Sequence, residues 1–274
     1  MRPERRVEAH HFEALGTVCS LFGIGLPAGA LSSGEQWVRE VGGRLTRFAA
    51  DSELSRLNAS DGRWMTVSRE LEAVLHEAMR AYESSGGLVN IAVLPSLMAI
   101  GYTRPLAIGA TRVALESAEP SPVLPDVLEV QHGRARLRPG NGLDLGGIAK
   151  GWMADRLCEQ LAGNLVANIG GDLRAVGPGP RGDGWPVGIG GATLTLHDKG
   201  AATSSVRKRR WDGGHHLIDP RTGLPSRSGL EEVSVIAETG VRAEVVAKTA
   251  LLLGPEVAPA FCAANALAWW IAEP

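Results

Sequence analysis

The sequence has no apolar run near the ~20 residues that a bilayer-spanning helix needs, and it carries no strong charge of either sign. Its 28 lysines and arginines are balanced by 30 aspartates and glutamates, which leaves a formal net charge of -2 over 274 residues. A near-neutral chain has no global basic field with which to attract nucleic acid. These two shortages argue against a membrane span and against a nucleic-acid partner, and they are typical of an ordinary globular protein.

Cysteine is also scarce. The three residues Cys19, Cys158 and Cys262 are an odd number, and no C-x-x-C spacing occurs. Each lies in an apolar context, which predicts buried free thiols, with a catalytic or metal-binding cysteine as the alternative.

Several familiar signatures are absent as well. The N-terminus begins with basic residues but has Glu8, His10 and His11 where a signal peptide would have its apolar core,. We therefore expect a cytoplasmic protein without a signal peptide. Neither a Walker-type loop, a G-x-S-x-G elbow nor an H-E-x-x-H motif occurs, so the chemistry must be sought elsewhere.

Helical and strand-like patterns mingle without regular βαβ alternation, which predicts the α+β class. Ser68 is expected to cap the clearest helix, and Asp51 or Ser52 a shorter one,. The segment His11–Ile24 is expected to form a strand that is interrupted at Gly16,. Further predicted features are turns at His132-Gly133, Gly170-Gly171 and Gly190-Gly191 and a strand over Glu232–Ala237.

The most distinctive stretch is Leu143–Gly151 (LDLGGIAKG), an apolar entry followed by two glycines and a helix-like pattern. The pair Gly146 and Gly147 would let the backbone turn sharply and let a ligand approach closely. A helix that starts after such a turn presents free N–H groups, which suit a phosphate. Lys150 could add a point charge and Asp144 could hold a metal or a ligand hydroxyl. The alternative is a tight strand–helix turn with a surface lysine.

Five motifs occur in a fixed order along most of the chain, from about residue 11 to residue 254. They are Ala14–Thr17 (ALGT), Asp51–Asn58 (DSELSRLN), Asp144–Gly151, Asn168–Asp172 (NIGGD) and His216–Gly223 (HLIDPRTG). Together they resemble the motifs of the FAD:protein FMN transferase family, known as ApbE.

The resemblance implies a magnesium-dependent enzyme that splits the pyrophosphate of FAD. Such an enzyme attaches FMN through a phosphoester to a Thr or Ser of a target flavoprotein and releases AMP. Catalysis of this kind relies on positioning and on neutralising phosphate charge. The implied fold is an ApbE-like, T-fold-like, two-lobed single domain over residues 1–274, with mixed helices and antiparallel-rich sheets.

The resemblance also implies which residues bind FAD. The positions that match are Leu15, Gly16, Thr17, Phe48, Leu88, Val89, Asn90, Asp144, Lys150, His216 and Ile218. Among them, Phe48 would stack on a ring of the cofactor. His216 is the candidate for acid–base catalysis, and the alternative is a hairpin histidine that bonds to its own turn.

The expected metal ligands are the carbonyl of Gly147 and the side chain of Glu244, and here the sequence departs from the family pattern. The usual Ala-Asp with a Thr four residues on appears as Glu244 with Lys248, which could simply form an i,i+4 ion pair,. Asn90 also replaces a usual aspartate. Three hypotheses follow: an FMN transferase, an FAD-binding protein that has lost metal-dependent transfer, or an FAD pyrophosphatase that yields FMN and AMP.

Overall fold

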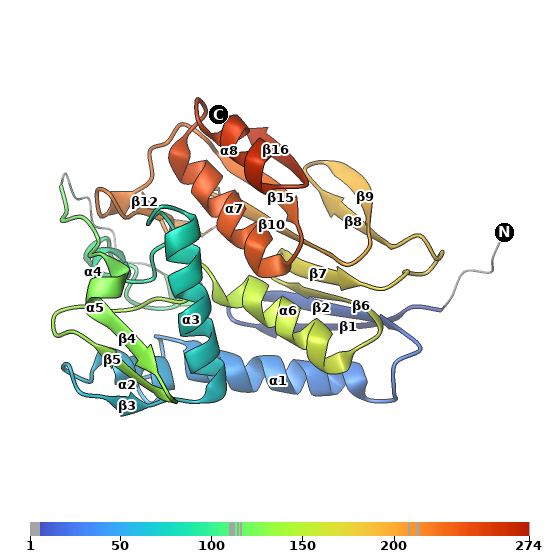
Figure 1. Ribbon diagram of the computed structural model, residues 1–274, viewed down its shortest axis with the longest axis horizontal. Coiled ribbons are helices and arrows are strands. Elements are labelled where there is room, and N and C mark those ends of the chain that lie inside the picture. The colour runs from blue at the N-terminus through green and yellow to red at the C-terminus, as the bar shows by residue number, and fades with distance from the viewer. Residues whose placement is uncertain are drawn as a thin grey trace.

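The computed structural model describes residues 6–109, 113, 115, 117–207, 209–211 and 214–273. Its centre is a seven-stranded sheet in the order β1-β2-β6-β7-β10-β15-β16, and all neighbouring strands are antiparallel (Figure 1). These strands are β1 (Glu8–Ala14), β2 (Thr17–Ile24), β6 (Asn164–Ile169), β7 (Asp172–Val176), β10 (Lys199–Ser205), β15 (Glu232–Ala237) and β16 (Ala268–Ala272).

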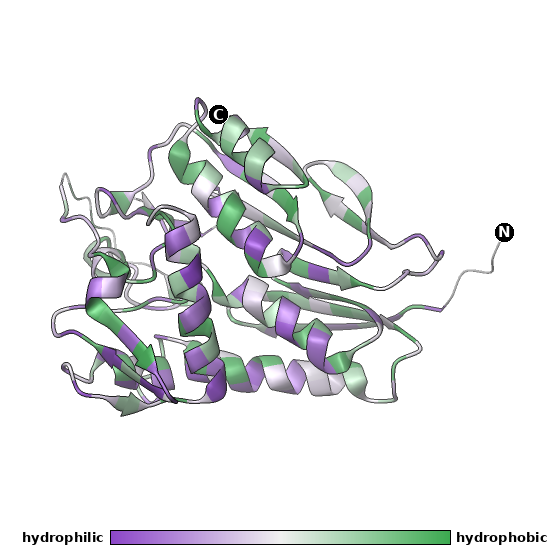
Figure 2. Ribbon diagram, viewed as in Figure 1, coloured by the Kyte–Doolittle hydropathy of each residue, from purple (hydrophilic) through white to green (hydrophobic). Residues whose placement is uncertain are grey.

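Long helices cover one face of this sheet. Helix α1 (Ala30–Leu45) packs on β1 and β2, α6 (Ala149–Leu161) on β6 and β7, and α7 (Gly240–Leu253) on β10 and β15 (Figure 1). Helix α3 (Arg69–Ser84) contacts both α1 and α6. Figure 2 shows polar residues recurring along α3, whereas α7 is mostly apolar because it is buried nearly all round.

The strands alternate their side chains between two cores. In β6, Leu165 and Ala167 join the core beneath the helices, and Val166 between them joins a core on the opposite face,. That opposite face is covered by a hairpin of β8 (Trp185–Ile189) and β9 (Ala192–Leu196). An antiparallel sheet with helices on one face confirms the predicted α+β class, and the extent of the domain over residues 1–274 stays a prediction.

Shorter elements complete the described part of the chain. They are α2 (Glu53–Asn58), β3 (Met65–Thr66), α4 (Leu94–Ala99), a 3-10 turn (Leu106–Ile108), α5 (Leu124–Val127), β4 (Leu128–Gln131), β5 (Arg134–Leu137), β11 (Arg210–Trp211), β12 (Gly214–His215), β13 (Ile218–Asp219), β14 (Leu224–Pro225) and α8 (Ala258–Asn265). A small sheet in the order β3-β5-β4 packs with α2, α3 and α5. None of the helices in these ranges is both long and apolar enough to cross a bilayer.

Local sequence signals placed the helix starts correctly. The Ser52 hydroxyl accepts a hydrogen bond from the Ser55 amide at 3.0 Å, and the Ser68 hydroxyl accepts one from the Leu71 amide at 3.2 Å. Both serines are therefore N-caps, as predicted. The predicted turn at His132-Gly133 is also confirmed, since it joins β4 to β5.

The interruption predicted at Gly16 within His11–Ile24 is confirmed, but the segment forms two antiparallel strands instead of one, because the chain reverses at this break. Leu15 and Gly16 both adopt positive φ angles, of 56° and 67°. Two successive residues in this region form a tight hairpin turn, so the segments on either side pair with each other as β1 and β2,. The turn carries Leu15 and Gly16 to one end of the sheet.

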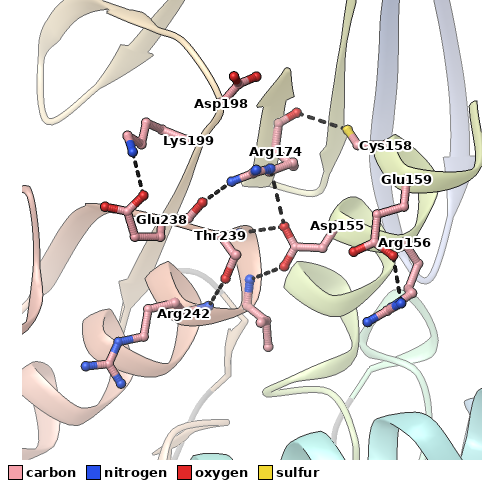
Figure 3. A network of polar contacts seen from close by, with 12 residues as sticks. Asp155, Arg156, Cys158, Glu159, Arg174, Asp198, Lys199, Glu238, Thr239 and Arg242 are labelled. Carbon is pink, nitrogen blue, oxygen red and sulfur yellow. Dashed lines mark hydrogen bonds and ion pairs between the residues drawn. The ribbon is translucent and has the colours of Figure 1, made fainter. Parts of the chain in front are cut away.

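Helices α6 and α7 are joined by a buried carboxylate (Figure 3). Asp155 on α6 accepts hydrogen bonds from the amides of Gly240 at 2.7 Å and Val241 at 2.9 Å, at the start of α7. The Thr239 hydroxyl caps the same helix end by accepting from the Arg242 amide at 3.1 Å. Asp155 thus satisfies N–H groups that no turn of α7 can reach.

We expect Asp155→Ala to lower the free energy of unfolding by about 2–3 kcal/mol, because two buried amides lose their acceptor. Urea denaturation at pH 8 measures this with the carboxyl ionised, since burial raises its pKa only to about 6. The matched control is Glu159→Ala on the same helix, whose exposed pair with Arg156 should contribute at most about 0.5 kcal/mol. Equal effects of the two variants would contradict the proposed link between α6 and α7.

Candidate functional site

A cavity of about 610 Å³ lies where segments from distant parts of the chain converge. Its wall is built by the β1–β2 turn, the end of α1, the loop that precedes α4, the start of α6 and the chain between β12 and β13. The volume is within the range of roughly 300–1,000 Å³ that small-molecule and cofactor sites occupy.

Most of the predicted site residues meet in the wall of this cavity. They are Leu15, Gly16, Phe48, Leu88, Val89, Asn90, Asp144, Gly147, Lys150, His216 and Ile218. Two predicted residues lie outside the wall. Thr17 is the first residue of β2 and its side chain lies against Gly170, and Glu244 is buried behind Lys150.

Asn90 holds two loops together. Its side-chain amide donates to the carbonyl of Pro122 at 2.8 Å, and its oxygen accepts from the amide of Ala92 at 2.8 Å. An aspartate could not donate the first of these bonds. The amide at this position therefore ties the segment around Pro122 to the loop that precedes α4.

Asp144 is held by an arginine that the sequence did not reveal. Its carboxylate accepts from Arg47 Nε at 2.5 Å and from the Gly146 amide at 2.8 Å. The Arg47 guanidinium lies 4.2 Å from the ring centre of Phe48 and 4.6 Å from that of Tyr102, and it donates to the Tyr102 carbonyl at 2.8 Å. The guanidinium thus lies close to two aromatic rings, which are tilted by 58° to each other, and this cation–π cluster forms part of the wall,.

Lys150 turns its ammonium group away from the open cavity toward two carboxylates. It donates to Asp172 and, at 3.1 Å, to Glu244. Burial works against the charge of Lys150, but these two carboxylates outweigh it and raise the lysine pKa. Burial raises the pKa of Asp172 to about 6, against the pull of Lys150. Lys150 thus lies in the predicted place, with its charge already paired.

The groups around Gly147 do not provide a suitable set of ligands for a magnesium ion. The Gly147 carbonyl accepts a hydrogen bond from Lys248 Nζ at 2.6 Å. Both oxygens of Glu244 are also engaged, one with Lys150 and the other with the Gly151 amide at 2.9 Å. Magnesium requires near-octahedral oxygen ligands, yet an ammonium group occupies the carbonyl that was expected to serve as one. The expected metal site at Gly147 and Glu244 therefore has no support in this geometry.

The other ionisable side chains also give no support to a metal site. Within residues 6–109, 113, 115, 117–207, 209–211 and 214–273, no group of three or more His, Cys, Asp or Glu side chains could hold a metal ion. The expected i,i+4 ion pair is also not the one formed, because Glu244 pairs with Lys150 while Lys248 reaches Gly147. Burial lowers the pKa of Lys248, and the Glu244 carboxylate opposes that shift.

His216 faces the cavity as a neutral imidazole. Burial and the nearby charges of Arg209, Lys248 and Lys150 hold its pKa well below the usual histidine value. Its Nδ1 is buried and has no hydrogen-bond partner in the described part of the chain. A neutral ring with a free nitrogen can accept a proton at pH 7.

The alternative reading of a histidine bonded to its own turn describes the neighbouring His215. That ring donates from Nε2 to the Ser226 carbonyl at 3.1 Å and accepts at Nδ1 from the Leu217 amide at 3.2 Å. His215 is thereby a structural residue of the β12–β14 region. The two adjacent histidines therefore have different surroundings, and His216 is the one that meets the cavity.

The cysteines take no part in the site. Cys19, Cys158 and Cys262 are buried free thiols, as predicted. Burial raises the pKa of Cys19 to about 11 and that of Cys158 to about 12, so neither forms a thiolate at neutral pH,. This disfavours the alternative of a catalytic cysteine.

The structure is thus an α+β protein with a largely apolar cavity, whose wall also carries cationic side chains, the carboxylate of Asp144 and a neutral histidine. The chain belongs to the ApbE family, since the model described as "ApbE family" matches residues 15–270. Two relatives, both named FAD:protein FMN transferase, come from Klebsiella pneumoniae (strain 342) and Haemophilus influenzae. The first is 30% identical over 244 residues, covering 80% of this chain and 73% of the relative. The second is 25% identical over 273 residues, covering 86% and 76%.

Solved structures confirm the ApbE-like fold. The apo flavinyl transferase ApbE of Pseudomonas stutzeri superposes with a TM-score of 0.85 at 22% identity, covering 99% of this chain and 94% of the other. The ApbE protein of Thermotoga maritima gives a TM-score of 0.84 at 22% identity, with coverage of 97% and 94%. At this level of identity the likeness concerns the fold.

Proposed function

We propose that this protein is an FAD:protein FMN transferase, which cleaves FAD, attaches FMN to a Thr or Ser of a target flavoprotein and releases AMP. Membership of the ApbE family and the names of its relatives support this reading. The observation that carries it for this chain is the cavity, whose wall contains residues of three of the five motifs, Ala14–Thr17, Asp144–Gly151 and His216–Gly223.

The residues in the wall suit each part of FAD. The apolar side chains of Leu15, Leu88 and Val89 suit the ring systems, and Phe48 at the rim suits a stacked ring,. The cations Arg209 and Lys248 suit the pyrophosphate,. Thr17, outside the wall, would contribute through the backbone of its turn.

The proposed reaction has a balanced course. The acceptor hydroxyl oxygen attacks the phosphorus of the FMN half, and the bond from that phosphorus to the bridging oxygen breaks. AMP departs with the bridging oxygen, and the hydroxyl proton passes to the neutral ring of His216. The cationic side chains offset the charge that develops on the phosphate oxygens. No step is assigned to magnesium, because the donors around Gly147 do not fit it.

A second candidate is an FAD-binding protein without transfer activity, and the hydrogen bond from Lys248 to Gly147 favours it. An FAD pyrophosphatase, in which water replaces the acceptor hydroxyl, would use the same site.

One experiment separates these functions. The full chain is incubated with FAD and an acceptor flavoprotein of a characterised ApbE relative, and adduct and AMP are measured by mass spectrometry and chromatography. Transfer predicts an FMN adduct and equimolar AMP, and no adduct on an acceptor whose target Thr is changed to Val. AMP without adduct would indicate a pyrophosphatase, and bound FAD without AMP would indicate a binding protein.

A further inference from the structure

The place where a divalent ion was expected is taken by a side chain of the protein itself. Lys248 extends from α7, and its Nζ donates to the carbonyl of Gly147 at 2.6 Å, across 101 residues of sequence. Lys248 and Gly147 both belong to the cavity wall. The ammonium group is therefore fixed at the edge of the proposed pyrophosphate site.

The absence of a side chain at residue 147 makes this contact possible. A Cβ at that position would lie 1.8 Å from Lys248 Nζ, far inside any permitted contact. The close approach of ammonium and carbonyl therefore depends on glycine. Gly147 and Lys248 form a matched pair, in which one residue provides the room and the acceptor for the other.

The two lysines in the cavity wall, Lys150 and Lys248, differ in whether a carboxylate neutralises their charge. Lys150 is neutralised by direct ion pairs with both Asp172 and Glu244. In the part of the chain that the structure describes, Lys248 has no such ion pair, and its hydrogen bond goes to a neutral carbonyl. An ammonium group has three donors, so two remain for an anion in the cavity.

We propose that Lys248 is the resident cation of this site, so that the protein binds the pyrophosphate of FAD without a divalent metal. The ammonium donates hydrogen bonds to phosphate oxygens and transfers no proton. This inference rests on the proposed function, because FAD is the ligand whose pyrophosphate it places here. It makes Lys248 a binding residue with a charge that replaces the expected ion.

The test measures FAD binding directly, by the change in flavin fluorescence on titration with the full-length protein. For the wild type we expect the same Kd, within about twofold, in excess EDTA and in excess MgCl2, because the charge of Lys248 takes the place of a divalent ion. Lys248→Met keeps the length of the side chain and removes its charge. We expect it to weaken FAD binding about tenfold or more in EDTA, because charged hydrogen bonds to phosphate are lost.

The matched control is Lys199→Met, which removes a lysine whose pair with Glu238 is at the surface, and it should leave the Kd unchanged. A thermal melt establishes that each variant is folded. If Lys248→Met does not fold, the Kd of the wild type for FAD in EDTA, compared with that in MgCl2, still tests whether binding requires a divalent metal.

The outcomes also separate this inference from the proposed function. FAD binding by the wild type that needs Mg²⁺, or tight binding by folded Lys248→Met in EDTA, would overturn the role of Lys248 and leave the transferase intact. Metal-free binding that depends on Lys248 but yields no FMN adduct would support the inference and overturn the transferase. A wild type that binds no FAD under either condition would overturn both.

Discussion

Replacing His216 by asparagine is expected to lower the kcat of FMN transfer by about 10²–10⁴-fold, the usual contribution of a general base. The neutral ring of His216, held uncharged by burial and by Arg209 and the two lysines, accepts the proton of the acceptor hydroxyl. Asparagine is polar and of similar width but cannot accept a proton at neutral pH. We therefore expect the Kd for FAD to stay within about threefold, as measured by flavin fluorescence, while the chemical step slows.

The dependence on pH provides a second readout for His216. A base whose pKa is lowered stays neutral as the pH falls through the usual histidine value of about 6.5,. Hence the wild-type kcat should stay level down to pH 6.5 and decline only at lower pH, where the ring becomes protonated. This acid limb should disappear in His216→Asn.

The matched control for His216 is its neighbour. His215→Asn removes a ring that bonds to its own turn through Ser226 and Leu217. We expect a lower melting temperature and a kcat within about threefold of the wild type, since neutral hydrogen bonds of this kind contribute about 1 kcal/mol to stability. Wild-type kcat in His216→Asn would refute the assignment of His216 as base.

The second large effect concerns stability. Lys150→Met should lower the free energy of unfolding by about 3–5 kcal/mol at pH 7–8, because it leaves the buried carboxylates of Asp172 and Glu244 without their shared cation,. Methionine preserves the length and apolar stem of the side chain. Urea denaturation, monitored by tryptophan fluorescence, measures the loss.

The sign of the pH dependence tests the cause. The charge of Lys150 lowers the pKa of both carboxyls, so its removal raises them in the folded state, and that of Asp172 then exceeds about 6. Groups with a raised folded pKa stabilise the protein below their unfolded value of about 4 and lose this contribution as the pH rises through the folded value. The deficit of Lys150→Met should therefore be smallest near pH 5 and largest at pH 8.

Lys199→Met serves as the control for charge removal, since its partner Glu238 is exposed and the pair should contribute at most about 1 kcal/mol. A deficit for Lys150→Met that is as small as this, or that grows toward acid pH, would show that Lys150 does not neutralise the buried carboxylates.

Features that depend on neighbouring residues could be predicted from the sequence. The caps at Ser52 and Ser68 need only a hydroxyl and an amide three residues away, and the strand over Glu232–Ala237 was predicted with its observed bounds. The glycine turns were found because positive φ angles restrict the choice of residue. By contrast, α8 (Ala258–Asn265) was missed, since its small apolar residues lack a polar face that would mark a helix.

Residues that line the site could be predicted from the sequence, but the ion pairs that they form could not. Most of the residues predicted for the site do lie in the cavity wall, yet the partners of Asp144 and Lys150 lie far away in sequence. Arg47 reaches Asp144 across 97 residues, and Lys150 meets Glu244 across 94. Such ion pairs are set by tertiary packing, and no local spacing indicates them. Arg47 adjoins the predicted aromatic Phe48, but a single arginine just beyond the end of an amphipathic helix carries no signal of its own.

The contact between Gly147 and Lys248 also constrains how this chain can change over evolutionary time. Because a Cβ at residue 147 would lie 1.8 Å from the lysine Nζ, alanine there would force the flexible end of Lys248 away from its observed position. Conversely, a shorter residue at 248 removes the reason for glycine. The two positions should therefore covary among related chains, because glycine at 147 is needed only where a lysine at 248 donates to the carbonyl of residue 147.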